Sequence, residues 1–257
     1  LLKLCLLKLP SPPTKNNQRR RLMIKATHID HMGSDLSVVN AARVSFGKKS
    51  EWEQHAEDHI SFHKVVNTLS DKDTKLIKYL AKHKHLSPFG HAFASFHVKA
   101  PIFVARQLVK HKFLRWNEIS RRYVDDTPEF YVPEVWRGRS EDKKQGSSDQ
   151  TVEFLRMQGL SEQTVDDATF KHKLHSLTLY HDMINEGVAP EQARMVLPQS
   201  TMTEFYWSGS LDAFAAMCVL RLKSDTQYES RIVAEQIDKE MTSLYPISWE
   251  ALVHGEA

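Results

Sequence analysis

The chain has 257 residues, of which 41% are hydrophobic and 26% charged, a composition typical of a soluble globular chain of one large or two small domains. Its longest stretch without Lys, Arg, Asp or Glu runs from His85 to Val98, which is shorter than a membrane-spanning helix requires. The two cysteines, Cys5 and Cys218, are too few for a disulfide framework or a cysteine-based zinc site, so we expect a reducing compartment, the cytoplasm.

The formal net charge of +3 is unevenly distributed. Residues 1–22 hold six basic residues and no acidic one, so the rest of the chain carries 29 basic against 32 acidic residues. We expect residues 1–22 to lie outside the fold, with the native start at Met23 and one domain over 23–257. An organellar transit peptide is the alternative for this segment, because it is basic and free of acid.

Periodicity and end signals predict the elements of the first half of the chain. In order, these are a strand over residues 22–29, a helix from Ser34 or Asp35 to Ala42, an amphipathic helix over 71–83, a strand over 93–98, and a further helix with Pro101 in its first turn. Histidines at 55, 59 and 63 have the spacing of one helix face, which favours a surface helix stripe over a metal site.

The second half of the chain is predicted to be mostly helical. It contains an exposed loop over residues 137–150, helices around 170–186 and 192–196, a β-prone aromatic segment over 201–207, and helices over 211–222 and 227–244. Helices are interspersed with strands, and there is neither an internal repeat nor a glycine-rich phosphate loop. Enzymes built on such a loop are therefore disfavoured.

The densest polar segment is 99–122, which holds seven Lys and Arg residues against the single acid Glu118. On a helix starting at Ile102, one face is apolar and the other presents Arg106, Gln107, Lys110 and His111. We expect this helix to end near Lys112 and residues 113–116 to turn the chain.

If residues 118–123 are extended, Glu118, Ser120 and Arg122 share one face of a strand. A carboxylate, a hydroxyl and a guanidinium beside a cationic helix end could hold a phosphorylated ligand. A solvated basic face is the plainer alternative.

Several motifs of this region resemble those of the flavin-dependent thymidylate synthases, the ThyX family. That family's signature is Arg-His-Arg followed after a short spacer by Ser, and this chain has Lys110-His-Lys112 and Ser120. The resemblance extends over about residues 23–253. It rests on Asn40-Ala-Ala-Arg-Val-Ser-Phe46, His85-Leu-Ser-Pro-Phe89, Ala100-Pro-Ile-Phe-Val-Ala-Arg-Gln107, Glu129-Phe-Tyr131, Ala193-Arg-Met-Val-Leu-Pro198, Glu204-Phe-Tyr-Trp207 and Leu220-Arg221.

The resemblance implies an α+β fold, with a central twisted, mostly antiparallel sheet and flanking helices in a single domain. It implies reductive methylation of dUMP to dTMP, with tightly bound FAD as cofactor, methylenetetrahydrofolate as carbon donor and NADPH as reductant. It also implies a homotetramer with active sites shared between subunits. Neither nucleic acid nor a membrane is expected as a partner.

The resemblance also assigns roles to individual residues. The residues expected to contact FAD are His85, Ser87, Lys110, His111, Lys112, Glu118, Ser210 and Ala216. Those expected to surround dUMP are Gln107, Lys110, Glu118, Ser120, Arg121, Arg122, Arg194 and Arg221. Arg221 is the expected catalytic residue, because a guanidinium beside the uracil favours loss of the imide proton and pushes electron density toward the carbon to be alkylated. No metal is expected.

The chain departs from the family pattern at several of these positions. Lys110 and Lys112 replace arginines and lack the planar bidentate grip of a guanidinium. Gly90 stands where the family often has Glu, Asp225 where some members have His, and Ser210 and Ala216 where some have an Asn that helps hold FAD.

Two other functions remain open from the sequence. A metal-dependent nucleotide phosphohydrolase could use the histidines together with His181-Asp182, and a nucleic-acid-binding module could use the basic segment 99–122. A cysteine-dependent thymidylate synthase is disfavoured, because Cys218 lies in a segment typical of a helix core and Cys5 lies in the basic extension.

Overall fold

The computed structural model describes residues 23–59, 62–124, 126–141, 146–156 and 162–255, and at residues 56–59 and 62–65 it describes the backbone only. In chain order the helices are α2 (Asp35–Arg43), η1 (Val44–Phe46), α3 (Asp71–Lys82), η2 (Ser87–His91), α4 (Ile102–Leu108), α5 (Val165–Asn185), α6 (Pro190–Ala193), η3 (Arg194–Val196), α7 (Leu211–Arg221), α8 (Tyr228–Leu244), α9 (Pro246–Trp249) and η4 (Glu250–His254). The strands are β1 (Lys25–Met32), β2 (Glu53–His59), β3 (Phe62–Thr68), β4 (Phe93–Pro101), β5 (Leu114–Glu118), β6 (Arg137–Arg139), β7 (Ser147–Thr151), β8 (Phe154–Leu155), β9 (Gln163–Thr164) and β10 (Met202–Ser210).

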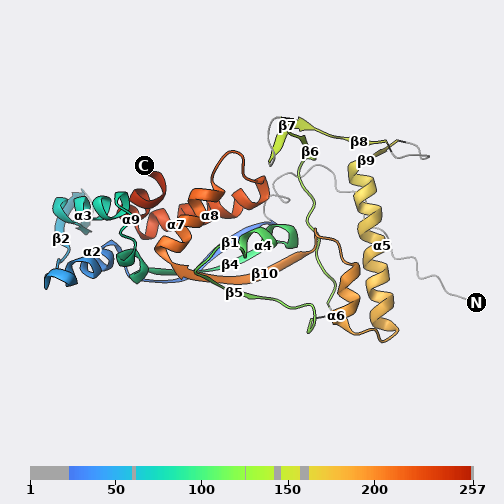
Figure 1. Ribbon diagram of the computed structural model, residues 1–257, viewed down its shortest axis with the longest axis horizontal. Helices are drawn as coiled ribbons and strands as arrows, with labels where there is room; N and C mark the ends of the chain where they lie inside the picture. Colours follow the sequence, from blue (N-terminus) through green and yellow to red (C-terminus); the bar gives the residue numbers. More distant parts are fainter. Residues whose placement is uncertain (1–22, 60–61, 125, 142–145, 157–161, 256–257) are drawn as a thin grey trace, which may run out of the picture.

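A four-stranded sheet in the order β1, β4, β10, β5 forms the centre of the molecule (Figure 1). Every neighbouring pair in it is antiparallel. The expected α+β fold with an antiparallel central sheet is therefore confirmed. No helix in the described part of the chain combines the length and apolar character needed to cross a bilayer.

The core lies between one face of this sheet and the helices α4, α7 and α8 (Figure 1). Alternate residues of β4 and β10 point into it, including Phe96 and Trp207, whose rings lie 5.3 and 5.5 Å from that of Phe214 on α7. The opposite face carries polar side chains, and His97 Nε2 lies 3.1 Å from Glu204 Oε2 there. The period-two alternation in the sequence thus fixes which face of the sheet the helices cover.

The helices α2 and α3 pack together at one end of the molecule through a buried carboxylate. Asp73 is 3% exposed and accepts hydrogen bonds from Arg43 on α2 (Nε to Oδ1, 2.9 Å), from Ser50 (3.0 Å) and from Ser70 (2.9 Å). Its own backbone N–H donates to Ser70 Oγ at the start of α3 (3.1 Å), the N-cap contact that helix starts favour.

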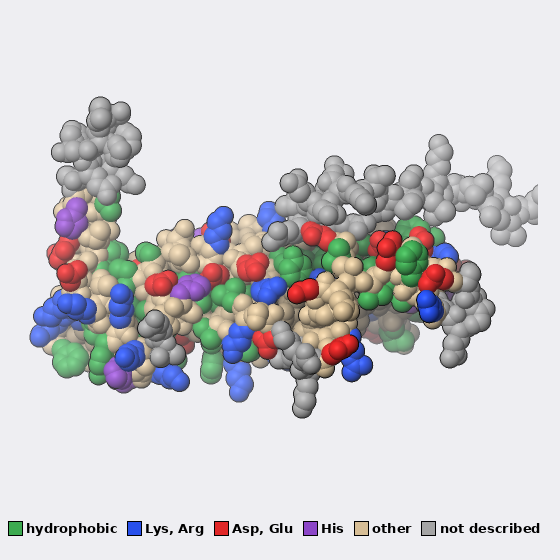
Figure 2. All heavy atoms as spheres, turned by 90° about the horizontal axis from the view of Figure 1, so that it is seen from above, with side chains coloured by type: hydrophobic (Ala, Val, Ile, Leu, Met, Phe, Trp, Pro, Cys, Tyr) green, Lys and Arg blue, Asp and Glu red, His purple; other side chains and the backbone are tan. Residues whose placement is uncertain are grey.

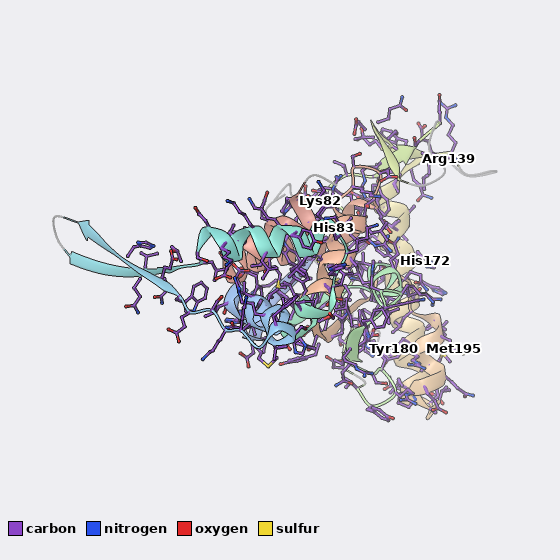
Figure 3. All side chains as sticks on the ribbon, turned by 60° about the vertical axis from the view of Figure 1, so that its left-hand side comes forward. Lys82, His83, Arg139, His172, Tyr180 and Met195 are labelled. Carbon is purple, nitrogen blue, oxygen red and sulfur yellow. The ribbon has the colours of Figure 1, made fainter. Side chains whose placement is uncertain are left out.

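At the other end, α5 stands apart from the sheet and packs against α6 and η3 (Figure 1). Figure 3 shows Tyr180 of α5 beside Met195 of η3. Tyr180 is fully buried, so α5 supports the short helical segment that begins with Arg194.

The predicted histidine stripe is wrong in its secondary structure. Residues 53–59 and 62–68 pair as the antiparallel strands β2 and β3, which extend away from the helices (Figure 3), and do not form a helix. Strand pairing sets Asp58 opposite His63 and His55 opposite Val66, so the spacing of four is shared between two strands. The side chains of His59 and His63 lie outside the described residues.

The chain after α4 also differs from the prediction. The helix ends at Leu108, and residues 114–118 form strand β5 where a turn was expected. The expected extended run over 118–123 stops at Glu118, because residues 121–123 form a turn. In the predicted loop over 137–150, β6 and β7 pair as a hairpin, and residues 142–145 of that loop lie outside the described part. The first strand begins and ends three residues later than predicted.

Candidate active site

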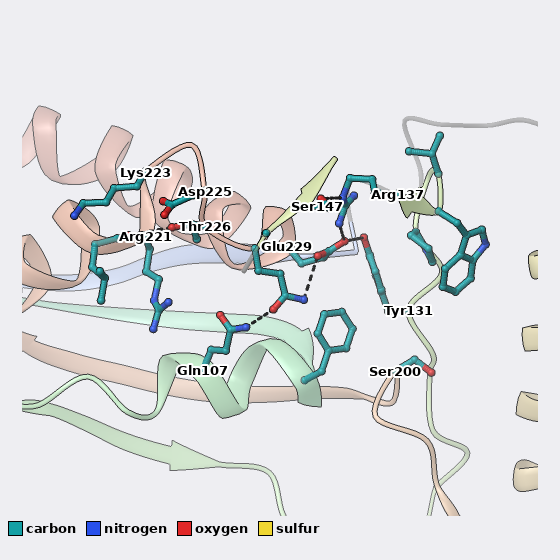
Figure 4. Close-up of a pocket in the computed structure, with 17 residues that line it drawn as sticks. Gln107, Tyr131, Arg137, Ser147, Ser200, Arg221, Lys223, Asp225, Thr226 and Glu229 are labelled. Atoms are coloured by element: carbon teal, nitrogen blue, oxygen red, sulfur yellow. Dashed lines mark hydrogen bonds and ion pairs between the residues drawn. The ribbon is translucent and has the colours of Figure 1, made fainter. Parts of the chain in front are cut away.

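A cavity of about 790 Å³ opens where the C-terminal ends of α4 and α7 meet the start of α8 and residues 131–137 and 146–147 (Figure 4). Two of the residues assigned to dUMP by the resemblance, Gln107 and Arg221, line it. Aromatic rings of Phe103, Tyr131 and Trp136 form part of its wall. We call this cavity the nucleotide pocket, because it combines flat apolar walls with an amide and a guanidinium.

The side-chain amide of Gln107 is held at both ends. Its Oε1 accepts a hydrogen bond from Ser230 Oγ (3.0 Å), and its Nε2 donates to Gln227 Oε1. Each amide atom retains one further hydrogen-bonding position. The orientation of Gln107 is therefore fixed before any ligand arrives.

A buried carboxylate extends this network into the pocket wall. Glu229 is 3% exposed and forms an ion pair with Arg137 (2.5 Å), while Gln227 Nε2 and Tyr131 Oη each lie 3.4 Å from one of its oxygens (Figure 4). Burial, and then the charge of Glu229, raise the pKa of Tyr131 above its usual value, so its hydroxyl keeps its proton. Arg137 compensates the buried charge of Glu229.

Arg221, the last residue of α7, connects the pocket to the Lys-His-Lys segment. Its Nε donates a hydrogen bond to His111 Nε2 (3.0 Å), which requires an unprotonated acceptor on the imidazole. Burial, and then the nearby Arg221 charge, lower the pKa of His111 to about 4, so the ring is neutral near pH 7. Burial also lowers the pKa of Arg221. A neutral His111 therefore orients the guanidinium without neutralising its charge.

The Lys-His-Lys segment itself forms a tight turn after α4. Lys110 and Lys112 are exposed, and neither lines the nucleotide pocket. Phe113, which follows them, has φ of 65°, a left-handed conformation that costs energy for a bulky residue, and its side chain is 85% exposed. Strained and exposed residues of this kind cluster at functional sites.

The other residues assigned to dUMP lie elsewhere on the chain surface. Glu118, at the end of β5, accepts from Thr203 Oγ1 (2.6 Å) and Trp116 Nε1 (3.0 Å). Ser120 Oγ accepts from the backbone and side chain of Arg122, both at 3.3 Å, and Arg121 pairs with Asp126 at 2.7 Å.

Arg194 is exposed on η3. Neither it nor the group Glu118, Ser120, Arg121 and Arg122 lines the nucleotide pocket. The structure of one chain thus brings together Gln107 and Arg221 and leaves the remaining assigned residues apart.

A second cavity, of about 600 Å³, lies between η2, the start of β4, residues 113–115 and the end of β10. Ser87 and Ser210, both assigned to FAD, line it, and so does Gly90. Phe93, Phe113 and Arg115 add two aromatic rings and a guanidinium. We call this cavity the flavin pocket.

One buried atom suggests what the flavin pocket can hold. Asp212 Oδ1 is buried and has no hydrogen-bond partner among the described residues, and Asp212 lines this cavity. An unpartnered buried acceptor is costly, so a ligand N–H or O–H would satisfy it. Serine hydroxyls, an acceptor, a cation and flat rings together fit part of a flavin nucleotide. Ala216 is exposed on α7 and does not line the cavity.

Sequence reasoning missed several residues of the two pockets, and four of them carry charge or a fixed hydrogen bond. Arg137, Gln227 and Glu229 in the nucleotide pocket and Asp212 in the flavin pocket carry no motif. Glu229 lies in the first turn of α8, where acidic residues are common because they stabilise helix N-termini. Its position in the sequence therefore gives no sign that it belongs to a pocket. Its partner Arg137 lies 92 residues earlier, and only the fold brings the two together.

Comparison with known proteins shows which family most of the chain matches. The family described as thymidylate synthase complementing protein matches residues 27–247. The flavin-dependent thymidylate synthase of Kosmotoga olearia is 36% identical over 228 residues, covering 88% of each chain. That of one Thermus thermophilus strain is 36% identical over 223 residues, covering 87% of this chain and 73% of the relative.

A solved structure agrees with these relatives. The UMP/dUMP methylase PolB from Streptomyces cacaoi, bound with 5-Br dUMP, has a TM-score of 0.70 at 28% identity and covers 89% of this chain and 94% of its own. The match of fold and the match of sequence therefore cover similar shares of the chain. This chain belongs to the thymidylate synthase complementing protein family, and flavin-dependent thymidylate synthases are its similar relatives.

Proposed function

We propose that this chain is a flavin-dependent thymidylate synthase that converts dUMP to dTMP, with FAD bound tightly, methylenetetrahydrofolate as carbon donor and NADPH as reductant. The observation that carries the proposal is Arg221, which is oriented by His111 at a pocket that also presents the fixed amide of Gln107. The family and the relatives reported above support the same reaction.

In this proposal the pyrimidine lies in the nucleotide pocket against the aromatic wall. The guanidinium of Arg221 then stabilises negative charge as the imide proton leaves, which raises electron density at the carbon to be methylated. Gln107, fixed by Ser230 and Gln227, offers one donor and one acceptor position to the pyrimidine edge. In the homotetramer that the resemblance implies, Arg122 and Arg194 bind the phosphate.

FAD would be held in the flavin pocket by the hydroxyls of Ser87 and Ser210, by Arg115 and by the unpartnered oxygen of Asp212. When bound, FAD supplies the hydride that reductive methylation requires. Lys110 and Lys112 would offer it point charges from the neighbouring turn.

A covalent route through cysteine has no support in the described residues. Cys218, the one cysteine among them, is fully buried, and burial raises its pKa well above the usual value. A nucleophilic thiol needs access and a thiolate, and this side chain has neither. The proposed reaction therefore relies on polarisation of the nucleotide by Arg221.

The alternative of a metal-dependent phosphohydrolase gains no support from the structure. Over the described ranges, no three His, Cys, Asp or Glu side chains are grouped so that they could hold a metal ion. His181 and Asp182 lie on α5, away from both pockets. The site geometry favours the thymidylate synthase.

Substitution of Arg221 tests the proposal. We expect Arg221→Ala to lower the rate of dTMP formation by at least about 100-fold, the scale on which single stabilising donors act, while flavin content and the unfolding midpoint stay close to wild type. Arg231→Ala, which removes an arginine outside the pocket, is the matched control and should retain activity. Near-normal turnover in Arg221→Ala would reject the assigned role.

A further inference from the structure

A third cavity, of about 750 Å³, lies between α2, η1 and α3. Its lining includes four Lys and Arg side chains and no Asp or Glu. Figure 2 shows Lys and Arg side chains gathered at the left-hand end of the molecule, the end that carries α2 and α3 in Figure 1. We call it the basic pocket, since an electropositive concavity without an acidic wall favours anions.

Three of the four cations are free to bind a ligand. Arg43 is already paired with the buried Asp73. Lys48, Lys72 and Lys75 are exposed and have no ion pair or hydrogen bond within the part of the chain that the structure describes. Like charges that converge on one cavity repel one another, so an anion that binds between them gains more than it would from a single lysine.

The rim and floor of the basic pocket are aromatic and apolar. Phe46 is 79% exposed and Tyr79 is 54% exposed, although both line the cavity, and Leu76 forms part of its floor. Lys84 has φ of 56°, which ends α3 abruptly and returns the chain so that the ring of His85 lies 6.1 Å from that of Tyr79. Exposed rings beside cations are suited to a ligand that joins a planar heteroaromatic ring to an anionic group.

The basic pocket adjoins the flavin pocket through consecutive residues. His85 lines the basic pocket, and the next two residues, Leu86 and Ser87, line the flavin pocket. The resemblance assigns His85 to FAD, and the structure places it at the boundary between the two cavities. The linings of the two cavities are therefore continuous along the chain at residues 85–87.

We propose that the basic pocket binds the anionic tail of a ring-bearing co-substrate, with the tail at Lys48, Lys72 and Lys75 and the ring toward His85 and Tyr79. This inference rests on the proposed function, which requires two co-substrates of this chemistry. The phosphates of NADPH and the glutamate carboxylates of a folate are both multiply charged tails on a planar ring. Binding measurements with each compound separate the two sources.

The test uses the FAD-loaded enzyme and two probes that are not turned over, NADP⁺ and triglutamyl folic acid, titrated by calorimetry. Reversing two of the three charges in Lys72→Glu/Lys75→Glu should weaken binding of at least one probe about tenfold or more, because each lost charge-assisted contact is replaced by repulsion. The effect should shrink at high salt. Lys78→Glu, on the same helix but outside the cavity, should bind both probes as wild type does.

The results distinguish NADP⁺ from the folate as the ligand of the basic pocket, and they test this inference separately from the proposed function. Weakened binding of NADP⁺ alone assigns the pocket to the dinucleotide, weakened binding of the folate alone assigns it to the carbon donor, and either result supports the site. Wild-type affinity for both probes in the double variant overturns the inference, as does failure of the wild type to bind either. Formation of dTMP by the wild type is measured separately, so the proposed function is tested independently of ligand binding in the basic pocket.

Discussion

The hydrogen bond between Arg221 and His111 forms only when the imidazole of His111 is unprotonated. The imidazole accepts a hydrogen bond from the guanidinium at 3.0 Å, and a protonated ring would offer no acceptor and would repel it. Because the pKa of His111 is about 4 in the fold and 6.5 ordinarily, the unfolded chain binds more protons between these values. The free energy of unfolding therefore rises with pH over this window. The contribution that His111 makes to it is lost as pH falls from about 6.5 toward 4.

This predicts a difference between pH profiles. The wild type should lose stability below pH 6.5 more steeply than His111→Gln, which keeps an acceptor but does not titrate, by at most about 1.4 kcal/mol per pH unit. Urea unfolding between pH 4 and 7 measures the difference. His83→Gln, at an exposed histidine, should leave the wild-type slope unchanged, and parallel profiles for wild type and His111→Gln would contradict the assignment.

A second prediction at this scale concerns the buried charge of Glu229. Arg137→Met leaves that carboxylate uncompensated and should lower the free energy of unfolding by about 2–4 kcal/mol, because an unpaired buried charge is strongly unfavourable. Adding Glu229→Gln should recover part of the loss. The exposed Arg139 on the same strand provides the control, and Arg139→Met should change stability by less than about 0.5 kcal/mol. Equal losses in the single and double variants would mean that the charge pair is not the cause.

At the scale of elements, most of the regular structure follows from the sequence, and the exceptions have physical causes. The helices α3, α7 and α8 lie where apolar periodicity predicted them. The hairpin β2–β3 was mistaken for a helix, because residues four apart share a face in both structures. Strand β5 was missed because its extended form depends on pairing with β10, a segment about 90 residues later.

The same limit applies to the two pockets. Gln107 and Arg221, which the resemblance assigned to dUMP, line the nucleotide pocket, and Ser87 and Ser210, which it assigned to FAD, line the flavin pocket. The positions of Arg137, Glu229 and Asp212 in these cavities could not be predicted, since they depend on how distant segments pack. Local patterns predict elements well, whereas the walls of a cavity depend on how those elements pack.

The pairing of β10 with β5 depends on a residue without a side chain. A Cβ on Gly209 would lie 2.4 Å from Leu114 Cδ2 and 3.1 Å from the carbonyl oxygen of Phe113. We therefore expect Gly209→Ala to lower the free energy of unfolding by about 1–3 kcal/mol, the usual cost of overpacking. Gly90 and Gly209 both line the flavin pocket, but a Cβ on Gly90 would meet no atom within 4 Å. Gly90→Ala should therefore stay within about 0.5 kcal/mol of wild type. Similar chemical unfolding curves for both variants would contradict this packing account.

At the scale of the whole molecule, the residues assigned to dUMP lie in separate places on one chain. Gln107 and Arg221 line the nucleotide pocket, whereas Ser120 and Arg122 lie in the turn after β5, outside it. A homotetramer in which a second copy brings that turn to the pocket would unite Ser120 and Arg122 with Gln107 and Arg221. The polar face of the central sheet, which α4, α7 and α8 leave uncovered, gives such an assembly room for contacts.

Mixed assemblies test this sharing. Arg221→Ala and Arg122→Ala should each be nearly inactive alone, yet co-expressed subunits should regain up to about a quarter of wild-type activity, because random pairing places both native residues at one site in four. Purification through two different affinity tags isolates the mixed species. Activity that stays at the level of the single variants would show that each site is built from one chain.

The reaction itself is the most direct test of the central claim. The FAD-loaded enzyme, with dUMP labelled by tritium on carbon 5, methylenetetrahydrofolate and NADPH, should release tritium to water in step with dTMP formation, since methylation replaces that hydrogen. Removal of FAD should stop both, and FAD added back should restore them. An enzyme that binds flavin and dUMP but forms no dTMP under these conditions would contradict the account.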